Sequence, residues 1–189
     1  MRELNQYLRE NENILWKSAP ENFPLLEGKL KLRIIGEWIV TVFFAACLFY
    51  VERDQPSFGT GVKALVILVA AAIILSPLVE YMNLQKQKYY LTDQRAILVT
   101  ADDSLYYMDY DKIDDCQLIE DVAQGGCIAM GSIIMADVRR QLRWQTCHPK
   151  MDQQEAATRG EALGMVFYKP AGVEKMVKLM QDNGVEVAM

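Results

Sequence analysis

The chain has 189 residues and a formal net charge of -5, which allows one small domain and an anchor but not two full globular domains. Hydrophobic residues make up 51% of the chain and its mean hydropathy is zero, yet these residues are concentrated in two blocks. The sequence contains no Walker loop, dinucleotide-binding glycine pattern, HExxH or GxSxG, so no motif points to a catalyst.

The two apolar blocks predict a transmembrane hairpin within residues 33–85. The first, IIGEWIVTVFFAACLFYV at residues 34–51, carries Glu37 as its single charge. The second has an uncharged center, ALVILVAAAIILSPLV, and extends over about residues 62–80. Each is long enough to cross a bilayer, and a chain this short cannot shield two helices that are apolar all round from water.

The distribution of basic residues predicts the orientation of this hairpin. Five basic residues lie before the first span and after the second, namely Lys29, Lys31, Arg33, Lys86 and Lys88. Only two, Arg53 and Lys63, lie at the ends that the polar connection 52–61 joins. The positive-inside rule therefore places residues 1–32 and 86–189 in the cytoplasm of a multi-pass inner-membrane protein. Glu37 and Glu80 then lie near the cytoplasmic interface, where a carboxylate reaches water.

The part of the chain after the hairpin is predicted to be mainly β. Seven short runs rich in β-branched and aromatic residues predict antiparallel strands. They lie at residues 88–92, 95–100, 104–110, 112–120, 126–136, 139–147 and 162–170. Residues 148–161 predict a loop, and Val173, Met176 and Met180 recur at helical spacing. Seven strands capped by one C-terminal helix predict a split barrel like that of pleckstrin-homology domains in residues 86–189.

A resemblance supports this prediction. The segment KYYLTDQRAILVT resembles the start of the domain in the bacterial pleckstrin-homology family of small membrane proteins, which opens with a tyrosine, Leu-Thr, a turn and an arginine. The matching residues are Tyr90, Leu91, Thr92, Asp93 and Arg95. ENILWKSAP before the first span, GGCIAMGSIIM and the final YKP agree as well. The resemblance covers nearly the whole chain and implies a membrane-bound, non-catalytic binding or assembly module.

Carboxylates and tyrosines between residues 107 and 121 predict a surface for another protein or a second copy. Aromatic rings supply affinity at interfaces, and charges at the rim set partner choice. The predicted patch consists of Tyr107, Asp109, Tyr110, Asp111, Asp114 and Asp115. The same carboxylates are also explained as the charged protection of a sheet edge.

Other partners are not predicted. Residues 86–189 hold 12 Lys and Arg against 16 Asp and Glu, so the domain is not expected to bind anionic lipid headgroups. The short basic stripe of Arg139, Arg140 and Arg143, beside Trp144, is too little in an acidic domain to predict nucleic-acid binding. No cofactor or metal ion is predicted.

Two alternative functions remain open. A metal- or redox-active membrane protein would use thiols and the single histidine, and these residues are Cys116, Cys127, Cys147 and His148. A structural subunit would instead pack its hairpin against another membrane protein or itself, because small residues allow close helix approach. The small residues are Ala45, Ala46, Ala70, Ala71 and Ala72.

Overall fold

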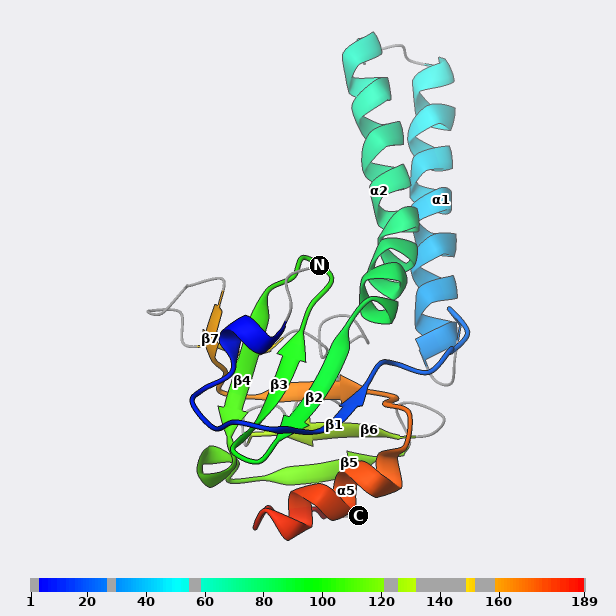
Figure 1. The fold of residues 1–189 in the computed structure, drawn as a ribbon. Helices are drawn as coiled ribbons and strands as arrows, with labels where there is room; N and C mark the ends of the chain where they lie inside the picture. Colours follow the sequence, from blue (N-terminus) through cyan, green and yellow to red (C-terminus); the bar gives the residue numbers. More distant parts are fainter. Residues whose placement is uncertain are drawn as a thin grey trace. The chain divides into compact units, whose positions relative to one another are not determined.

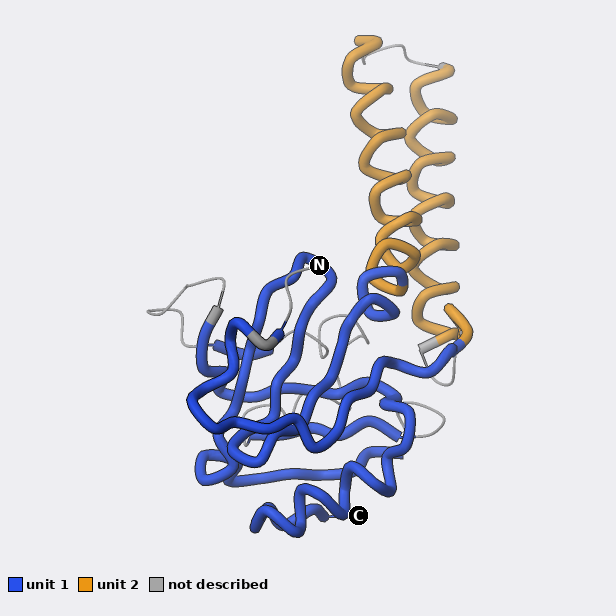
Figure 2. Tube along the Cα trace, viewed as in Figure 1, with its two compact units in different colours: residues 1–23, 82–189 blue, residues 24–81 orange. Residues whose placement is uncertain are grey.

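The chain folds into two compact units. The computed structural model describes residues 4–26, 30–54, 59–120, 126–131, 149–151 and 159–188. Residues 1–23 and 82–189 form one unit, here called the β unit, and residues 24–81 form the hairpin unit (Figure 2). The hairpin unit is therefore an insertion in the chain of the β unit, whereas residues 1–32 were predicted to be a separate segment.

The hairpin unit contains α1 (Leu30–Asp54) and all but the last turn of α2 (Thr60–Gln85), which run antiparallel (Figure 1). The prediction of two long apolar helices is confirmed, but both helices are longer than predicted. Glu52, which had been assigned to the connection 52–61, is helical, and Lys63 Nζ lies 2.8 Å from its Oε1. Arg33 Nε also lies 3.7 Å from Glu37 Oε1, one turn along α1.

The two helices meet along a narrow seam. The less exposed positions recur every three or four residues, as in coiled-coil packing. They include Thr41, Ala45 and Glu52 on α1, and Lys63, Val66, Ala70 and Ile74 on α2. Of the predicted small residues, Ala45 and Ala70 lie in this seam, whereas Ala46, Ala71 and Ala72 are exposed.

The first sheet of the β unit has five strands in the order β1-β2-β3-β4-β7. They are β1 (Ile14–Ser18), β2 (Lys88–Thr92), β3 (Arg95–Val99), β4 (Leu105–Asp109) and β7 (Arg159–Glu161). The antiparallel strands β2, β3 and β4 were predicted. The all-antiparallel prediction is wrong for β7, which pairs parallel with β4 inside the predicted loop 148–161. The sequence of β7, RGE, has no apolar alternation that would predict a strand. Its pairing with β4 holds it in place, and the Ala162 N–H, just after β7, donates to the Tyr107 carbonyl at 2.8 Å.

The second sheet is antiparallel in the order β5-β6-β8 and is followed by α5 (Val173–Asp182), which was predicted. Its strands are β5 (Cys116–Ile119), β6 (Cys127–Met130) and β8 (Met165–Tyr168). The strand predicted at 112–120 begins only at Cys116, because the 3-10 turn η2 (Tyr110–Lys112) includes its first residue and residues 113–115 are not in a strand. The strand predicted at 139–147, with its arginines, lies outside the described residues.

Among the described residues, the two sheets do not close into a barrel, although a bridge joins the segments just after β1 and β8. There Pro20 bridges Pro170, and the Glu21 N–H donates to the Lys169 carbonyl at 2.8 Å. The structure thus has two sheets and a C-terminal helix.

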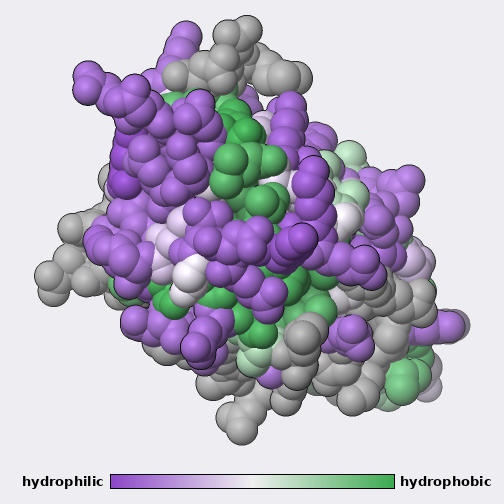
Figure 3. Space-filling model, turned by 60° about the horizontal axis from the view of Figure 1, so that its bottom comes forward, coloured by the Kyte–Doolittle hydropathy of each residue, from purple (hydrophilic) through white to green (hydrophobic). Residues whose placement is uncertain are grey.

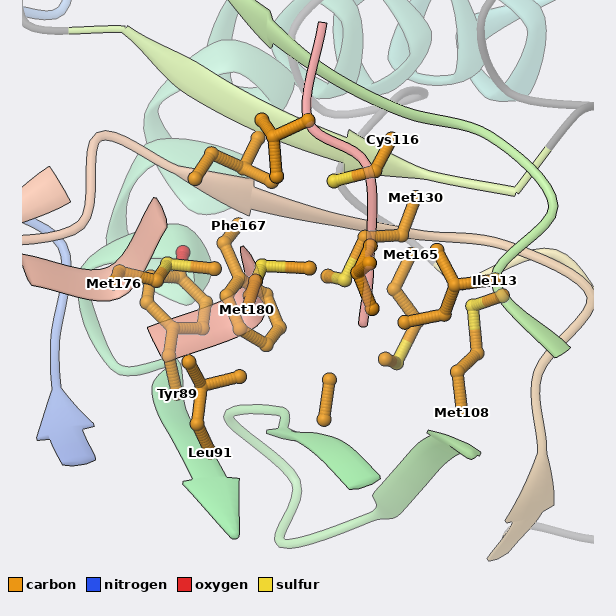
Figure 4. Packing of buried hydrophobic residues seen from close by; sticks show 14 of the residues in the cluster. Tyr89, Leu91, Met108, Ile113, Cys116, Met130, Met165, Phe167, Met176 and Met180 are labelled. Carbon is orange, nitrogen blue, oxygen red and sulfur yellow. The ribbon is translucent and has the colours of Figure 1, made fainter. Parts of the chain in front are cut away.

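The main core lies between the two sheets and α5, and methionine is prominent in it (Figure 4). Met108 and Met130 extend inward from β4 and β6, while Met176 and Met180 extend from α5. Tyr89 stacks on Phe167, with ring centroids 4.5 Å apart. Flexible thioethers fill the irregular space between sheets and helix. The surface shown in Figure 3 is mostly hydrophilic around a hydrophobic band.

The outer face of the first sheet is also covered. Successive strand residues point to opposite faces, so Tyr90, Ile97 and Leu105 face away from the main core. They pack against Leu4, Tyr7 and Leu8, at and just after the 3-10 turn η1 (Leu4–Tyr7). The N-terminal segment therefore belongs to the β unit: it covers one sheet face and supplies the edge strand β1.

Candidate functional site

The structure brings the predicted patch residues together in one connection between the two sheets. Tyr107 and Asp109 lie on β4, Tyr110 and Asp111 in η2, and Asp114 and Asp115 between η2 and β5. Tyr107, Asp109 and Tyr110 are half-buried. The other three, Asp111, Asp114 and Asp115, are exposed. Burial thus divides the patch into a packed group and a solvent-facing group.

Tyr107 and Asp109 contact arginines of the β unit. Arg9 Nη2 lies 2.9 Å from Asp109 Oδ1 and 3.0 Å from Oδ2. The hydrogen bond with Asp109 raises the pKa of Arg9. The guanidinium carbons of Arg9 and Arg95 lie 5.5 and 4.6 Å from the center of the Tyr107 ring, within cation–π range. These contacts make Tyr107 and Asp109 part of the scaffold.

Tyr110 also has an internal role. Its hydroxyl donates a hydrogen bond to the Thr92 carbonyl at 2.7 Å. Burial raises the pKa of Tyr110, and the negative charges of Asp93 and Glu12 raise it further. The phenol therefore stays a neutral donor that holds η2 against the turn between β2 and β3.

A buried ion pair lies beside this group. The side chains of Glu12 and Arg95 are 0% and 5% exposed, and two Arg95 nitrogens, Nε and Nη2, each lie 2.8 Å from a different Glu12 oxygen. Burial alone raises the pKa of Glu12, but hydrogen bonds outweigh it and lower that pKa overall. The donors are the Arg95 guanidinium, the Arg9 backbone N–H and the Thr92 hydroxyl. Arg95 Nη2 also donates to the Tyr7 carbonyl at 2.9 Å.

The turn between β2 and β3 positions this ion pair. Thr92 Oγ1 accepts a hydrogen bond from the Arg95 N–H at 2.9 Å. Asp93 Oδ1 accepts one from the Asn13 N–H at 3.0 Å, and the Asp93 N–H donates to the Asn13 carbonyl at 3.1 Å. Thr92, Asp93 and Arg95, which carried the resemblance, thus fasten the N-terminal segment to the sheet. Glu12 lies within ENILWKSAP, but its pairing with Arg95 was not predicted; opposite charges beside two apolar strands were the available signal.

The exposed carboxylates leave a different surface. Asp111, Asp114 and Asp115 form no ion pair within the described part of the chain. The neighboring cation, Lys112, pairs with Glu161 instead. The negative charge of these three residues therefore faces solvent without a direct ion-pair partner among the described residues.

The thiols proposed for metal or redox chemistry do not converge. On the ladder between β5 and β6, Cys116 lies opposite Met130 and Cys127 opposite Ile119. The two cysteines are thus at opposite ends of the ladder, roughly 10 Å apart along the strand direction. Burial raises the pKa of Cys116 to about 12, and Asp115 adds to this. Cys147 and His148 lie outside the described residues, and in the remainder no cluster of three His, Cys, Asp or Glu residues fits a metal ion.

Comparisons with known proteins do not assign the chain to a family. No protein-family model, no curated protein and no solved structure matches it. The likeness to bacterial pleckstrin-homology membrane proteins therefore depends on the residues quoted above.

Proposed function

We propose that this protein is an integral membrane protein whose hairpin unit spans the bilayer and anchors a non-catalytic β unit that docks another protein. The observation that carries the proposal is the exposure of the two helices. Only 6% of the residues in the most hydrophobic stretch of each helix are buried. Water disfavors so much exposed apolar surface, and a bilayer removes that cost.

Helix length agrees with this placement. α1 and α2 contain 25 and 26 residues. At about 1.5 Å per residue each is roughly 37–39 Å long, which exceeds a hydrocarbon core of about 30 Å. The excess places the charged ends in the interfacial regions.

The surplus of Lys and Arg at the two ends that join the β unit favors a cytoplasmic β unit. The two sheets and C-terminal helix also support a fold related to pleckstrin-homology domains, with β7 as a departure from that pattern. In this proposal the β unit is held at the inner face of the membrane, within reach of other membrane-bound proteins.

The docking surface we propose is the exposed acidic group Asp111, Asp114 and Asp115, because Tyr107, Asp109 and Tyr110 make internal contacts. A partner with a basic surface fits this charge. Electrostatic complementarity of this kind raises association rates and excludes wrong partners.

Crosslinking in native membranes tests the docking proposal. Asp111→Lys, Asp114→Lys and Asp115→Lys together should abolish crosslinks to a partner and leave the melting temperature nearly unchanged. The matched control reverses three exposed carboxylates elsewhere, Glu174, Asp182 and Glu186, and should retain the crosslinks. Retained crosslinks in the first variant would exclude the acidic group as the docking surface. A large fall in its melting temperature would show that these carboxylates are structural.

A further inference from the structure

A groove of about 390 Å³ opens between α1 and α2. Its rims are formed by Val40, Phe44 and Leu48 on α1 and by Leu65, Val69 and Ile73 on α2. This volume lies within the range of roughly 300–1,000 Å³ found for small-molecule sites. All of these residues belong to the hairpin unit, so the groove is a property of the two helices.

The lining of the groove includes one hydroxyl, that of Thr41, and this hydroxyl is already hydrogen-bonded within α1. Ala45 and Ala70, whose short side chains leave space in the seam, lie along it with Thr41. The Thr41 hydroxyl donates to the Glu37 carbonyl at 2.7 Å, one turn back along its own helix. An apolar chain therefore fills this groove without leaving a polar group unsatisfied.

The groove leads toward a charged end. A smaller cavity of about 50 Å³ shares Leu48 and Val66 with it and is also lined by Glu52 and Lys63. The Glu52 side chain is 5% exposed, whereas that of Lys63 is 43% exposed. An ammonium group has three N–H donors. Lys63 thus pairs with Glu52 and, being partly exposed, keeps N–H donors available on its solvent side.

The length of this path selects the occupant. From Val40 to Glu52 on α1, and from Lys63 to Ile73 on α2, the path is roughly 15–18 Å long at 1.5 Å per residue. Half of a hydrocarbon core of about 30 Å is of the same length. The groove is therefore one leaflet deep, with apolar walls inside and a cation at the interface. A packed transmembrane helix would instead cross both leaflets.

We propose that the groove binds one acyl chain of a phospholipid from the leaflet at the loop end of the hairpin, with the lipid phosphate at Lys63. The inference rests on the proposed membrane insertion. It concerns a single lipid in the hairpin unit and is separate from headgroup binding by the acidic β unit.

Native mass spectrometry tests the site on the full chain, released from nanodiscs of palmitoyl-oleoyl phosphatidylglycerol. Wild type should retain one phospholipid per chain. Val40→Phe with Val69→Phe fills the groove from its rims without altering Ala45 or Ala70. Retention of the phospholipid by this variant should fall by roughly tenfold, because a few methylenes of the acyl chain are no longer buried in the groove. Ile39→Phe with Leu68→Phe introduces the same two aromatic rings at exposed positions that do not line the groove and should retain the lipid.

A second variant tests the phosphate contact. Glu52→Gln with Lys63→Gln removes both charges together, so no buried carboxylate is left unpaired. This variant should retain less phosphatidylglycerol than wild type but equal amounts of palmitoyl-oleoyl glycerol, which has no phosphate. Equal loss of both lipids would contradict the assignment of the phosphate to Lys63.

Other outcomes would overturn the proposal. Unchanged lipid retention in the rim variant would show that the groove is not the site. A wild-type dimer that becomes monomeric in the rim variant would show that a second copy fills the groove. Alkaline carbonate extraction of membranes that contain the protein separates failure of the lipid proposal from failure of membrane insertion. An integral protein stays in the pellet whether or not the groove holds a lipid.

Discussion

Glu12 and Arg95 are 83 residues apart in the chain, yet their side chains are joined by two hydrogen bonds of 2.8 Å. Glu12 precedes the inserted hairpin unit and Arg95 follows it. The pair therefore connects the two parts of the chain from which the β unit is built, next to the ladder between β1 and β2.

Arg95→Gln should destabilize the β unit strongly. The substitution leaves the Glu12 carboxylate buried without its ionic partner, which costs about 3–5 kcal/mol in such pairs. Urea denaturation of the detergent-solubilized chain, followed by tryptophan fluorescence, measures the change. Arg9→Gln is the control, because the side chain of Arg9 is 42% exposed in its pair with Asp109 and such pairs contribute about 1 kcal/mol or less. Equal losses for the two variants would contradict a special role for the buried pair.

The same pair predicts how stability depends on pH. Because the folded protein lowers the pKa of Glu12, the ionized carboxylate stabilizes the fold fully above its unfolded pKa of about 4.3. This contribution is lost as the pH falls through the lower, folded pKa. The difference in unfolding free energy between wild type and Glu12→Gln should thus be constant above about pH 5 and shrink below pH ~4.3. A difference that grows on acidification would contradict the lowered pKa.

The inserted topology predicts which fragments fold. Residues 87–189 alone lack β1 and the segment that covers Tyr90, Ile97 and Leu105, so this fragment should aggregate or remain unfolded in water. Residues 1–23 joined by a short Gly-Ser linker to residues 82–189 restore both and should give a soluble protein. Circular dichroism and cooperative thermal unfolding distinguish the two. A stable, cooperatively folded 87–189 fragment would show that β1 is dispensable.

Two glycines predict different costs of adding a methyl group. Gly131 and Gly184 both have positive φ, +95° and +85°, so alanine is strained at either position by about 1–2 kcal/mol. At Gly131 the added Cβ would also collide with the Leu163 carbonyl oxygen, while at Gly184 nothing lies within 4 Å. Gly131→Ala should therefore lower the urea midpoint clearly more than Gly184→Ala. Equal midpoints would show that the backbone at Leu163 moves aside freely.

Elements with a strong local pattern could be predicted from the sequence. The apolar blocks of α1 and α2, the runs of β2, β3 and β4, and the 3.6-residue period of α5 all appear where expected. β1 and β7 were missed because each is ordered by pairing with a strand distant in the chain: β1 with β2, and β7 with β4. Neither segment has a long apolar alternation of its own.

The candidate site shows the same division. Its residues could be located as a dense run of carboxylates and tyrosines, but their separate roles depend on tertiary contacts. Asp109 binds Arg9 and Tyr110 binds the Thr92 carbonyl, whereas Asp114 and Asp115 face solvent. The fold makes that distinction, because the N-terminal segment brings Arg9 to Asp109 and β2 brings Thr92 to Tyr110.

Cysteine accessibility tests the central claim, a bilayer-spanning hairpin with a cytoplasmic β unit. Cys47 and Cys147 are first replaced by serine, while Cys116 and Cys127 are buried. Thr60 and Glu174, both exposed, are then changed to cysteine one at a time.

An impermeant thiol reagent should label Thr60→Cys in intact bacterial cells and Glu174→Cys only after the inner membrane is permeabilized. Labeling of Glu174→Cys alone in intact cells would contradict the orientation. Protection of both cysteines until lysis would contradict a hairpin that crosses the membrane.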